Sequence, residues 1–240
     1  MAVKRSNSAA RMLRVFERLA AAQPLGVSAL ARQLDADKSA VQRDLMTLAD
    51  AGWIRPVPAA PGQWELAPHV LTLARPPQSS ESLRQRARPL LEHLRRESGE
   101  TAYLIVPDGD HFVVLDALES FHMLRTVPPV GLVVPVNGSA TATAFLAHVP
   151  EAEQARLLGG AVPPRLAKDF ALTRQRGYAV NDEDVHPGAV AMAAAVLDAA
   201  GTPLGSLVVT GPAERLTPAK RETVGALLRD AARMVNLGQS

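Results

Sequence analysis

The stretch SALARQLDADKSAVQRDLMTLADAGWI, residues 28–54, constrains the fold of this chain more than any other. Its apolar residues recur at helical spacing in two short runs, separated by the polar break Asp35-Ala36-Asp37. We expect Ser28 to cap the first helix and Gly52 to end the second in a left-handed conformation. The stretch therefore predicts two short helices around one core, whose inward-facing residues are Leu30, Ala31, Leu34, Val41, Leu45 and Leu48.

The segments on either side of this stretch predict one more helix and a hairpin. Before it, an apolar stripe at helical spacing consists of Met12, Val15, Phe16, Leu19 and Ala20. After it, the extended runs WIRPV and QWELA lie on either side of Pro61-Gly62, which is a turn signal. Helix, helix, turn, helix and hairpin in this order are typical of a winged helix-turn-helix.

The outward face of the third helix is polar and basic. Arg43 can donate two hydrogen bonds to a guanine edge, and Gln42 can pair with an adenine edge. Lys38 and Ser39 suit phosphate oxygens, which fix the register of a protein on DNA without reading its sequence. A solvated helix face is the alternative interpretation. The helix-turn-helix setting favours a DNA-reading surface, and we add Ser28 and the predicted wing residue Arg55 to the candidate contacts.

The charge of the chain is unevenly distributed. Residues 1–75 hold 10 Lys and Arg against 6 Asp and Glu, a net charge of +4, whereas the rest of the chain carries −2. A basic amino-terminal third fits a polyanionic partner, although a basic solvated surface gives the same count. Lys4 and Arg5 form a short arm that could reach the minor groove, and Gln63 is a further wing candidate. Asp37 and Asp44 count against this picture because they bring negative charge near the DNA backbone.

A Pro- and Ser-rich segment, ARPPQSSES, is the best domain boundary in the sequence. We expect a DNA-binding domain at 1–74, a linker at 75–82 and a second domain at 83–240. The second domain opens with a helix over Leu83–Leu94 and goes on with two hairpin patterns, which turn at Asp108-Gly109 and Ala200-Gly201. An extended run at 123–127, a helix entered near Ser139, a helix stopped by Gly177 and a last helix from Thr217-Pro218 complete the pattern. Strands paired by hairpins predict an antiparallel α+β domain.

Four segments of the chain, in the same order and at similar separations, resemble the IclR family of bacterial transcription regulators. They are SALARQLDADKSAVQRDLMTLADAGWI, ARPLLEHLRRESGETAYL, RGYAVNDEDVHPG and VVTGPAERLT. The resemblance implies a winged helix-turn-helix followed by a GAF-like effector domain, with an antiparallel sheet and flanking helices. It also implies homodimers or homotetramers that bind double-stranded operator DNA under the control of a small-molecule effector.

The resemblance also implies an effector pocket. One wall maps to the loop at Asn137, Gly138, Ser139 and Ala140, whose helix amino end would favour a carboxylate-bearing effector. The other wall maps to Asn181, Ala191, Val208 and Thr210. The family often has an acid, a cysteine and a serine at the first three of these positions, so we expect this pocket to tolerate more apolar or aromatic metabolites. A plain helix cap and ordinary core packing are the alternative interpretations.

Other functional classes have little support in the sequence. The chain has no cysteine and no apolar run of about 20 residues, so we expect a cytoplasmic protein without disulfides. No nucleotide-binding or hydrolase motif is present, no cofactor is indicated, and a hydrolase built on Ser139 would lack an identifiable base. The acidic run Asp182, Glu183, Asp184 near His186 favours a solvated loop over a metal site. A DNA-binding protein with a non-sensing dimerisation domain remains the main alternative, ahead of a hydrolytic enzyme.

Overall fold

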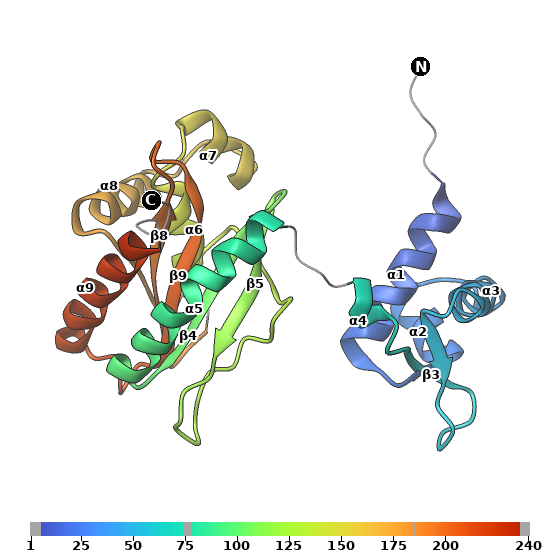
Figure 1. The fold of residues 1–240 in the computed structure, drawn as a ribbon. Helices are drawn as coiled ribbons and strands as arrows, with labels where there is room; N and C mark the ends of the chain where they lie inside the picture. The colour runs from blue at the N-terminus through green and yellow to red at the C-terminus, as the bar shows by residue number, and fades with distance from the viewer. Residues whose placement is uncertain (1–5, 74–77, 185, 236–240) are drawn as a thin grey trace. The chain divides into compact units, whose positions relative to one another are not determined.

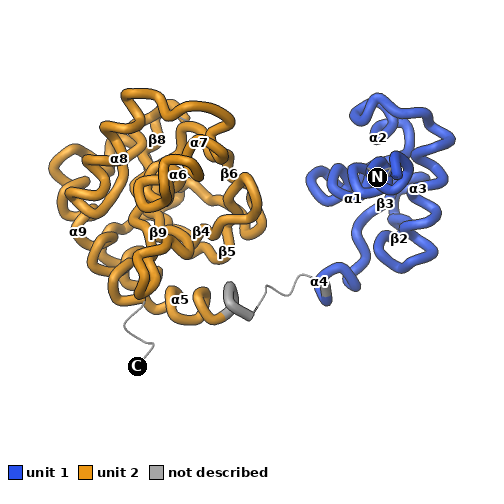
Figure 2. The backbone as a smooth tube through the Cα atoms, turned by 90° about the horizontal axis from the view of Figure 1, so that it is seen from above, with its two compact units in different colours: residues 1–76 blue, residues 77–240 orange. Residues whose placement is uncertain are grey.

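The computed structural model describes residues 6–73, 78–184 and 186–235 of the 240-residue chain, and only the backbone at 73 and 78–81. The chain divides into two compact units, residues 1–76 and 77–240 (Figure 2). Within the described part of the chain, every helix is too short or too polar to cross a bilayer.

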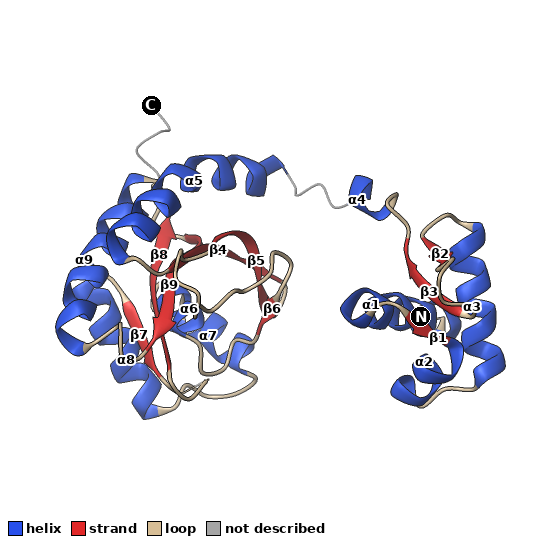
Figure 3. Cartoon of the chain, turned by 90° about the horizontal axis from the view of Figure 1, so that it is seen from below, coloured by secondary structure: helices blue, strands red, loops and turns tan. Residues whose placement is uncertain are grey.

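Unit 1 is a bundle of three helices with a small antiparallel sheet. The order of its strands in the sheet is β1-β3-β2. Its core is built mainly from predicted residues of the three helices, among which Val15, Leu19, Leu30, Val41 and Leu45 are completely buried. Ala20, which was predicted for the inward stripe of the first helix, is exposed. The elements, labelled in Figure 1 and, for β1 and β2, in Figure 3, are α1 (Asn7–Ala22), β1 (Leu25–Gly26), α2 (Val27–Leu34), α3 (Lys38–Asp50), β2 (Ile54–Pro56), β3 (Gln63–Leu66) and α4 (Val70–Leu73).

The start of α2 differs from the sequence prediction. Gly26 occupies the cap position without a side-chain hydrogen bond, and Ser28 is already the second residue of the helix. The reason is the short strand β1, in which Leu25 and Gly26 pair with β3 and lead directly into α2. The predicted helix ends are confirmed, because Asp35 closes α2 with a φ of 47° and Gly52 follows α3 with a φ of 77°.

Unit 2 is a six-stranded antiparallel sheet with helices on both faces (Figure 3). The order of its strands is β6-β5-β4-β9-β8-β7. Its elements are α5 (Gln78–Ser98), β4 (Thr101–Asp108), β5 (His111–Leu118), β6 (Val133–Val134), α6 (Ala140–Leu146), α7 (Glu151–Leu158), α8 (Pro164–Arg176), β7 (Ala179–Asp182), β8 (Ala189–Leu197), β9 (Pro203–Pro212) and α9 (Pro218–Met234).

The alternation of side chains along the central strands divides unit 2 into two cores. On β8, Met192 and Ala194 point towards α5 and α9, whereas Ala193 points towards α6. On β4, Leu104 belongs to the first core and Tyr103 to the second. This two-residue period is that of a strand buried on both faces. The second core, beneath α6, is the one that borders the predicted effector pocket.

Three details of unit 2 depart from the prediction. The first helix begins at Gln78 rather than at Leu83, so the predicted linker is helical over 78–82. The run 123–127 forms no strand, because the edge of β5 pairs instead with Val133–Val134. Strand β7 was not predicted, and it lengthens the sheet beyond β8.

Candidate DNA interface and effector cavity

The start of α3 is fixed by Asp37. Its carboxylate accepts hydrogen bonds from the backbone N–H groups of Ser39 and Ala40, at 2.9 and 3.1 Å, and from the Ser39 hydroxyl at 2.5 Å. The Ser39 hydroxyl and then these backbone groups hold the pKa of Asp37 below its ordinary value. Asp37 is therefore a helix cap, which stabilises the orientation of the residues that follow it.

The outward face of α3 is solvent-exposed and polar. Lys38, Ser39, Gln42 and Arg43 are all exposed, as is 46% of Met46. Arg43 lies one turn after Ser39, and one of its Nη atoms is 3.4 Å from the Ser39 hydroxyl oxygen. The structure therefore brings these predicted contacts together on one helix face, with their donors directed away from the core.

The opposite face of α3 is held by the core and by one ion pair. Asp44, which the sequence placed near the DNA backbone, is buried and accepts hydrogen bonds from Arg11 of α1 at 2.7 and 3.1 Å. This prediction was wrong, because Asp44 shares the inward side of the helix with Val41 and Leu45. The pair ties α3 to α1 and removes one negative charge from the outer face.

Ser28 and Lys38 meet at an open depression between α2 and the start of α3. Arg32, Asp35 and Asp37 complete its lining. Ser28 is exposed but is a helical residue here and not the predicted cap.

The predicted wing residues lie on the small sheet. Arg55 of β2 pairs with Glu65 of β3 at 2.7 Å, so its charge is partly neutralised by its cross-strand neighbour. Gln63 begins β3 next to the turn at Gly62. Lys4 and Arg5, the predicted basic arm, lie outside the described residues.

Unit 2 contains a mostly apolar cavity of about 260 Å³ beneath the amino end of α6. Five of the eight predicted effector residues line it, namely Ser139, Ala140, Asn181, Ala191 and Thr210. The remaining walls come from β4, from the loop between β5 and β6, and from the start of β8. Residues distant in sequence therefore meet around one space of a size suited to a small metabolite.

Most polar side chains that were predicted for this cavity already bond to the protein backbone. The Ser139 hydroxyl accepts from the N–H of Ala142 at 3.1 Å and so caps α6. The Thr210 hydroxyl donates to the carbonyl of Val190 at 3.1 Å. The Asn181 side-chain amide donates to the carbonyl of Gly138. These bonds position the walls but leave few donors for a ligand.

Tyr103 and Thr141 also line the cavity and were missed by the sequence analysis. Neither hydroxyl makes a hydrogen bond with another described residue. Burial raises the pKa of the Tyr103 phenol, which keeps it a neutral donor. Tyr103 carries a polar tip directly before the aliphatic run Leu104-Ile105-Val106, and this signal could have identified it.

Three predicted effector residues do not line this cavity. Val208 is completely buried in the core beneath α6. Asn137 is exposed and lines neither this cavity nor its neighbour. Gly138 borders an adjacent polar cleft, with its carbonyl bound to Asn181.

The acidic run at the end of β7 makes ion pairs and a hydrogen bond with other residues of the same chain. Asp182 pairs with Arg221 at 2.7 Å, and Asp184 lies 3.7 Å from Arg165. Glu183 accepts from the N–H of Gly188 at 2.7 Å. Among the described residues, no group of three acids or histidines is arranged to hold a metal ion.

Two family models match this chain. The model of the IclR helix-turn-helix domain matches residues 8–58, and the model of the C-terminal domain of the bacterial transcriptional regulator IclR matches residues 78–237. Together they cover both units.

Individual proteins of this type match along nearly the whole chain. The transcriptional repressor IclR of Escherichia coli K12 is 29% identical over 245 residues, covering 96% of this chain and 89% of that protein. The glycerol operon regulatory protein of Streptomyces griseus is 30% identical over 239 residues, covering 95% and 93%. A solved IclR homolog from Microbacterium hydrocarbonoxydans, complexed with 4-hydroxybenzoate, has the same fold, with a TM-score of 0.79, 21% identity and coverage of 96% and 98%.

Proposed function

Because this chain belongs to the IclR family, whose members are DNA-binding transcriptional regulators and not enzymes, we propose that it reads an operator through α3 and senses a small metabolite in unit 2. The observation that carries the proposal is the outward face of α3, where four polar side chains project from a helix whose reverse side is buried.

Each contact on this surface has a distinct role. Arg43 and Gln42 read base edges in the major groove, and Lys38, Ser39 and Ser28 bind phosphate oxygens. Arg55 makes a weaker contact with the DNA phosphate backbone, because Glu65 competes for its guanidinium. Asp37 stays ionised as the helix cap and keeps these side chains in place.

The effector is a small aromatic or carboxylate-bearing metabolite. The apolar walls of the 260 Å³ cavity favour a flat, largely apolar body, and the hydroxyls of Tyr103 and Thr141 can bond to one polar group on it. The amino end of α6 supports a carboxylate only weakly, since the Ser139 hydroxyl already occupies the N–H of Ala142. The 4-hydroxybenzoate in the Microbacterium homolog is a ligand of this chemical kind.

The regulator works in the cytoplasm as a homodimer or homotetramer. Two copies of α3 related by two-fold symmetry would read a pseudo-palindromic operator.

A non-sensing C-terminal domain is the second candidate, and one observation favours it. The side chains of Ser139, Asn181 and Thr210 all bond to backbone atoms of the protein itself. A melting temperature that rises with 4-hydroxybenzoate or benzoate supports sensing, because a ligand that binds only the folded state stabilises it. A melting temperature that no aromatic or aliphatic acid changes supports the non-sensing domain.

The test of DNA reading is a gel-shift titration with the DNA upstream of the chain's own gene. Arg43→Ala should lose roughly 5- to 150-fold in specific affinity, the equivalent of about 1–3 kcal/mol for one bidentate base contact. Arg18→Ala, which removes an exposed arginine from α1, is the matched control. Equal affinity and equal sequence preference in wild type and Arg43→Ala would remove α3 from the reading role.

A further inference from the structure

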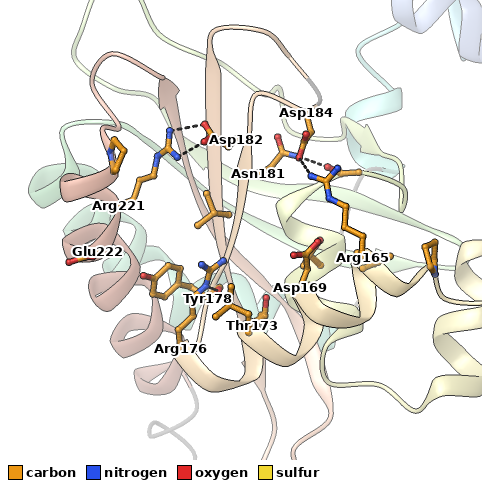
Figure 4. A pocket seen from close by; sticks show the side chains of 17 residues that line it. Arg165, Asp169, Thr173, Arg176, Tyr178, Asn181, Asp182, Asp184, Arg221 and Glu222 are labelled. Atoms are coloured by element: carbon orange, nitrogen blue, oxygen red, sulfur yellow. Dashed lines mark hydrogen bonds and ion pairs between the residues drawn. The ribbon is translucent and has the colours of Figure 1, made fainter.

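Unit 2 contains a second and larger cleft, beside the apolar cavity, that the proposed function does not use. It has a volume of about 720 Å³ and lies among α8, β7 and the first turn of α9 (Figure 4). Asn181 lines both spaces, so its bond to Gly138 forms part of the wall between them. The cleft is polar, in contrast to the apolar cavity beside it.

One face of α8 supplies most of the polar groups. Arg165, Asp169, Thr173 and Arg176 follow each other at intervals of four, four and three residues, which places them on one side of the helix (Figure 4). Tyr178 of the following loop closes the end of the cleft next to Arg176. The helix therefore presents a line of two cations, one anion and one hydroxyl to the same space.

Two pairs of opposite charges that line the cleft neutralise each other. Arg221 binds Asp182 through both Nη atoms, each at 2.7 Å, and this pairing holds the pKa of Asp182 below its ordinary value. Arg165 lies 3.7 Å from Asp184. A ligand would have to displace these partners to use the paired charges, so the charged groups of the cleft that form no ion pair are better candidates for binding.

Asp169 and Arg176 are two opposite charges of the cleft that form no salt bridge within the described part of the chain. The Nε of Arg176 donates to the carbonyl of Tyr178 at 2.5 Å, and the guanidinium lies 4.6 Å from the centre of the Tyr178 ring. Its Nη groups make no hydrogen bond with any other described residue. Asp169 is half-buried and, within the described part of the chain, forms no ion pair or hydrogen bond.

Thr173 lies between these two charges and points to a ligand independently of them. It is only 2% exposed, and its hydroxyl has no hydrogen-bond partner among the described residues. An unpartnered buried hydroxyl destabilises a folded protein, so it usually has a partner that the protein alone does not supply. Because Thr173 lines the cleft, a molecule bound there is placed to supply that partner.

We propose that this polar cleft is a second small-molecule site, which takes a zwitterion whose ammonium binds Asp169 and whose carboxylate binds the Nη groups of Arg176. Asp169 and Arg176 are seven residue steps apart, which is about 10 Å along the helix, so the ligand's two charges must be separated by a short methylene chain, as in an ω-amino acid. Glu222 also lines the cleft, and with Asp169 it disfavours a purely anionic ligand. The ligand accepts or donates one hydrogen bond at Thr173.

The test is isothermal titration calorimetry of the full chain with 6-aminohexanoate. Hexanoate and hexylamine, which each lack one of the two charges, should bind at least about tenfold more weakly, as expected for the loss of a charge-assisted hydrogen bond. The proposal would be overturned if 6-aminohexanoate did not bind, or if it bound no more tightly than hexanoate or hexylamine.

Two variants locate the site. Asp169→Asn should weaken the binding of 6-aminohexanoate at least about tenfold. Glu151→Gln, which changes an exposed acid on α7, should leave the binding affinity unchanged. Thr173→Val should weaken the binding of 6-aminohexanoate. It should also raise the melting temperature of the free protein, because it removes an unpartnered hydroxyl. Unchanged binding in Asp169→Asn would place the ligand elsewhere and refute the site. No DNA is present in these titrations, so their outcome is independent of the proposed operator reading.

Discussion

At the scale of single residues, two carboxylates of α3 have different roles: Asp37 caps the start of the helix, and Asp44 is buried against Arg11 of α1. The polar donors of α3 could be predicted because helical spacing decides which side of a helix is buried. Asp44 could not be placed correctly, since its partner Arg11 lies 33 positions earlier on another helix. Val208 was predicted to line the pocket from a resemblance, but the alternation along β9 puts it in the packed core beneath α6.

Asp37 gives a prediction at this scale, because one carboxylate stabilises the start of the DNA-reading helix. Asp37→Ala should lower the melting temperature at pH 7 by a few degrees, since three donors lose their acceptor. The pKa of Asp37 is lowered on folding, so its contribution is complete above the ordinary value of 3.8 and is lost as the pH falls through the folded-state pKa.

Melting temperatures of wild type and Asp37→Ala between pH 7 and pH 2 check both parts of this prediction. The difference between them should be constant near neutrality and should shrink in acid. Asp50→Ala is the control, because Asp50 lies at the opposite end of α3, where a negative charge gives no benefit. A difference that grows as the pH falls would contradict the assignment of Asp37 as an ionised cap.

At the scale of elements, hairpins and amphipathic helices were predictable because their signals are local. Both long hairpins turn where Asp108-Gly109 and Ala200-Gly201 indicated, and α6 begins after Ser139 as expected. Strands β6 and β7 were not predicted, since each has two to four residues and is defined by its partner strand. The same reason explains the error at 123–127, a run with strand-like composition that has no partner strand.

Gly205 gives a prediction for the packing of the central strands. A Cβ atom at this position would overlap the backbone carbonyl oxygen of Ile105 on β4, and Gly205 is buried. Gly205→Ala should therefore lower the free energy of unfolding by about 1–3 kcal/mol, as for other overpacked sites. Gly160→Ala, with open space around its Cβ and no positive φ, should be neutral or slightly stabilising in the same urea titration. Equal stability of Gly205→Ala and wild type would refute this close approach of β9 to β4.

The pair Glu100–Arg215 gives a second prediction about elements, because it links the start of β4 to the loop after β9. Glu100 is completely buried, and Arg215 binds both its oxygens at 2.6 and 2.8 Å. Arg215→Met should lower the free energy of unfolding by roughly 3–5 kcal/mol, since it leaves a buried carboxylate without a partner. Urea unfolding of the double variant Glu100→Met, Arg215→Met should recover much of this loss. If Arg215→Met were as stable as wild type, the prediction would be wrong, and another group would stabilise the carboxylate of Glu100.

At the scale of the whole molecule, the proposed DNA-reading and metabolite-binding functions belong to two different units of one chain, and α5 is the first helix of the second unit. This helix directly follows the boundary between the units and packs on the sheet through Leu83, Ala87, Leu91 and Leu94. A ligand changes DNA affinity only if it binds one arrangement of the dimer more tightly than the other. We infer that an effector beneath α6 acts by repacking the sheet that supports α5.

The most direct test of this central claim is the fluorescence anisotropy of labelled upstream DNA, titrated with the protein with and without saturating 4-hydroxybenzoate. We expect a change in DNA affinity of about fivefold or more, the usual lower range of allosteric coupling. Thr141→Val, which removes a hydroxyl from the cavity, should need more ligand for the same change. Identical titrations with and without the ligand, under conditions where the ligand raises the melting temperature and is therefore bound, would contradict the account.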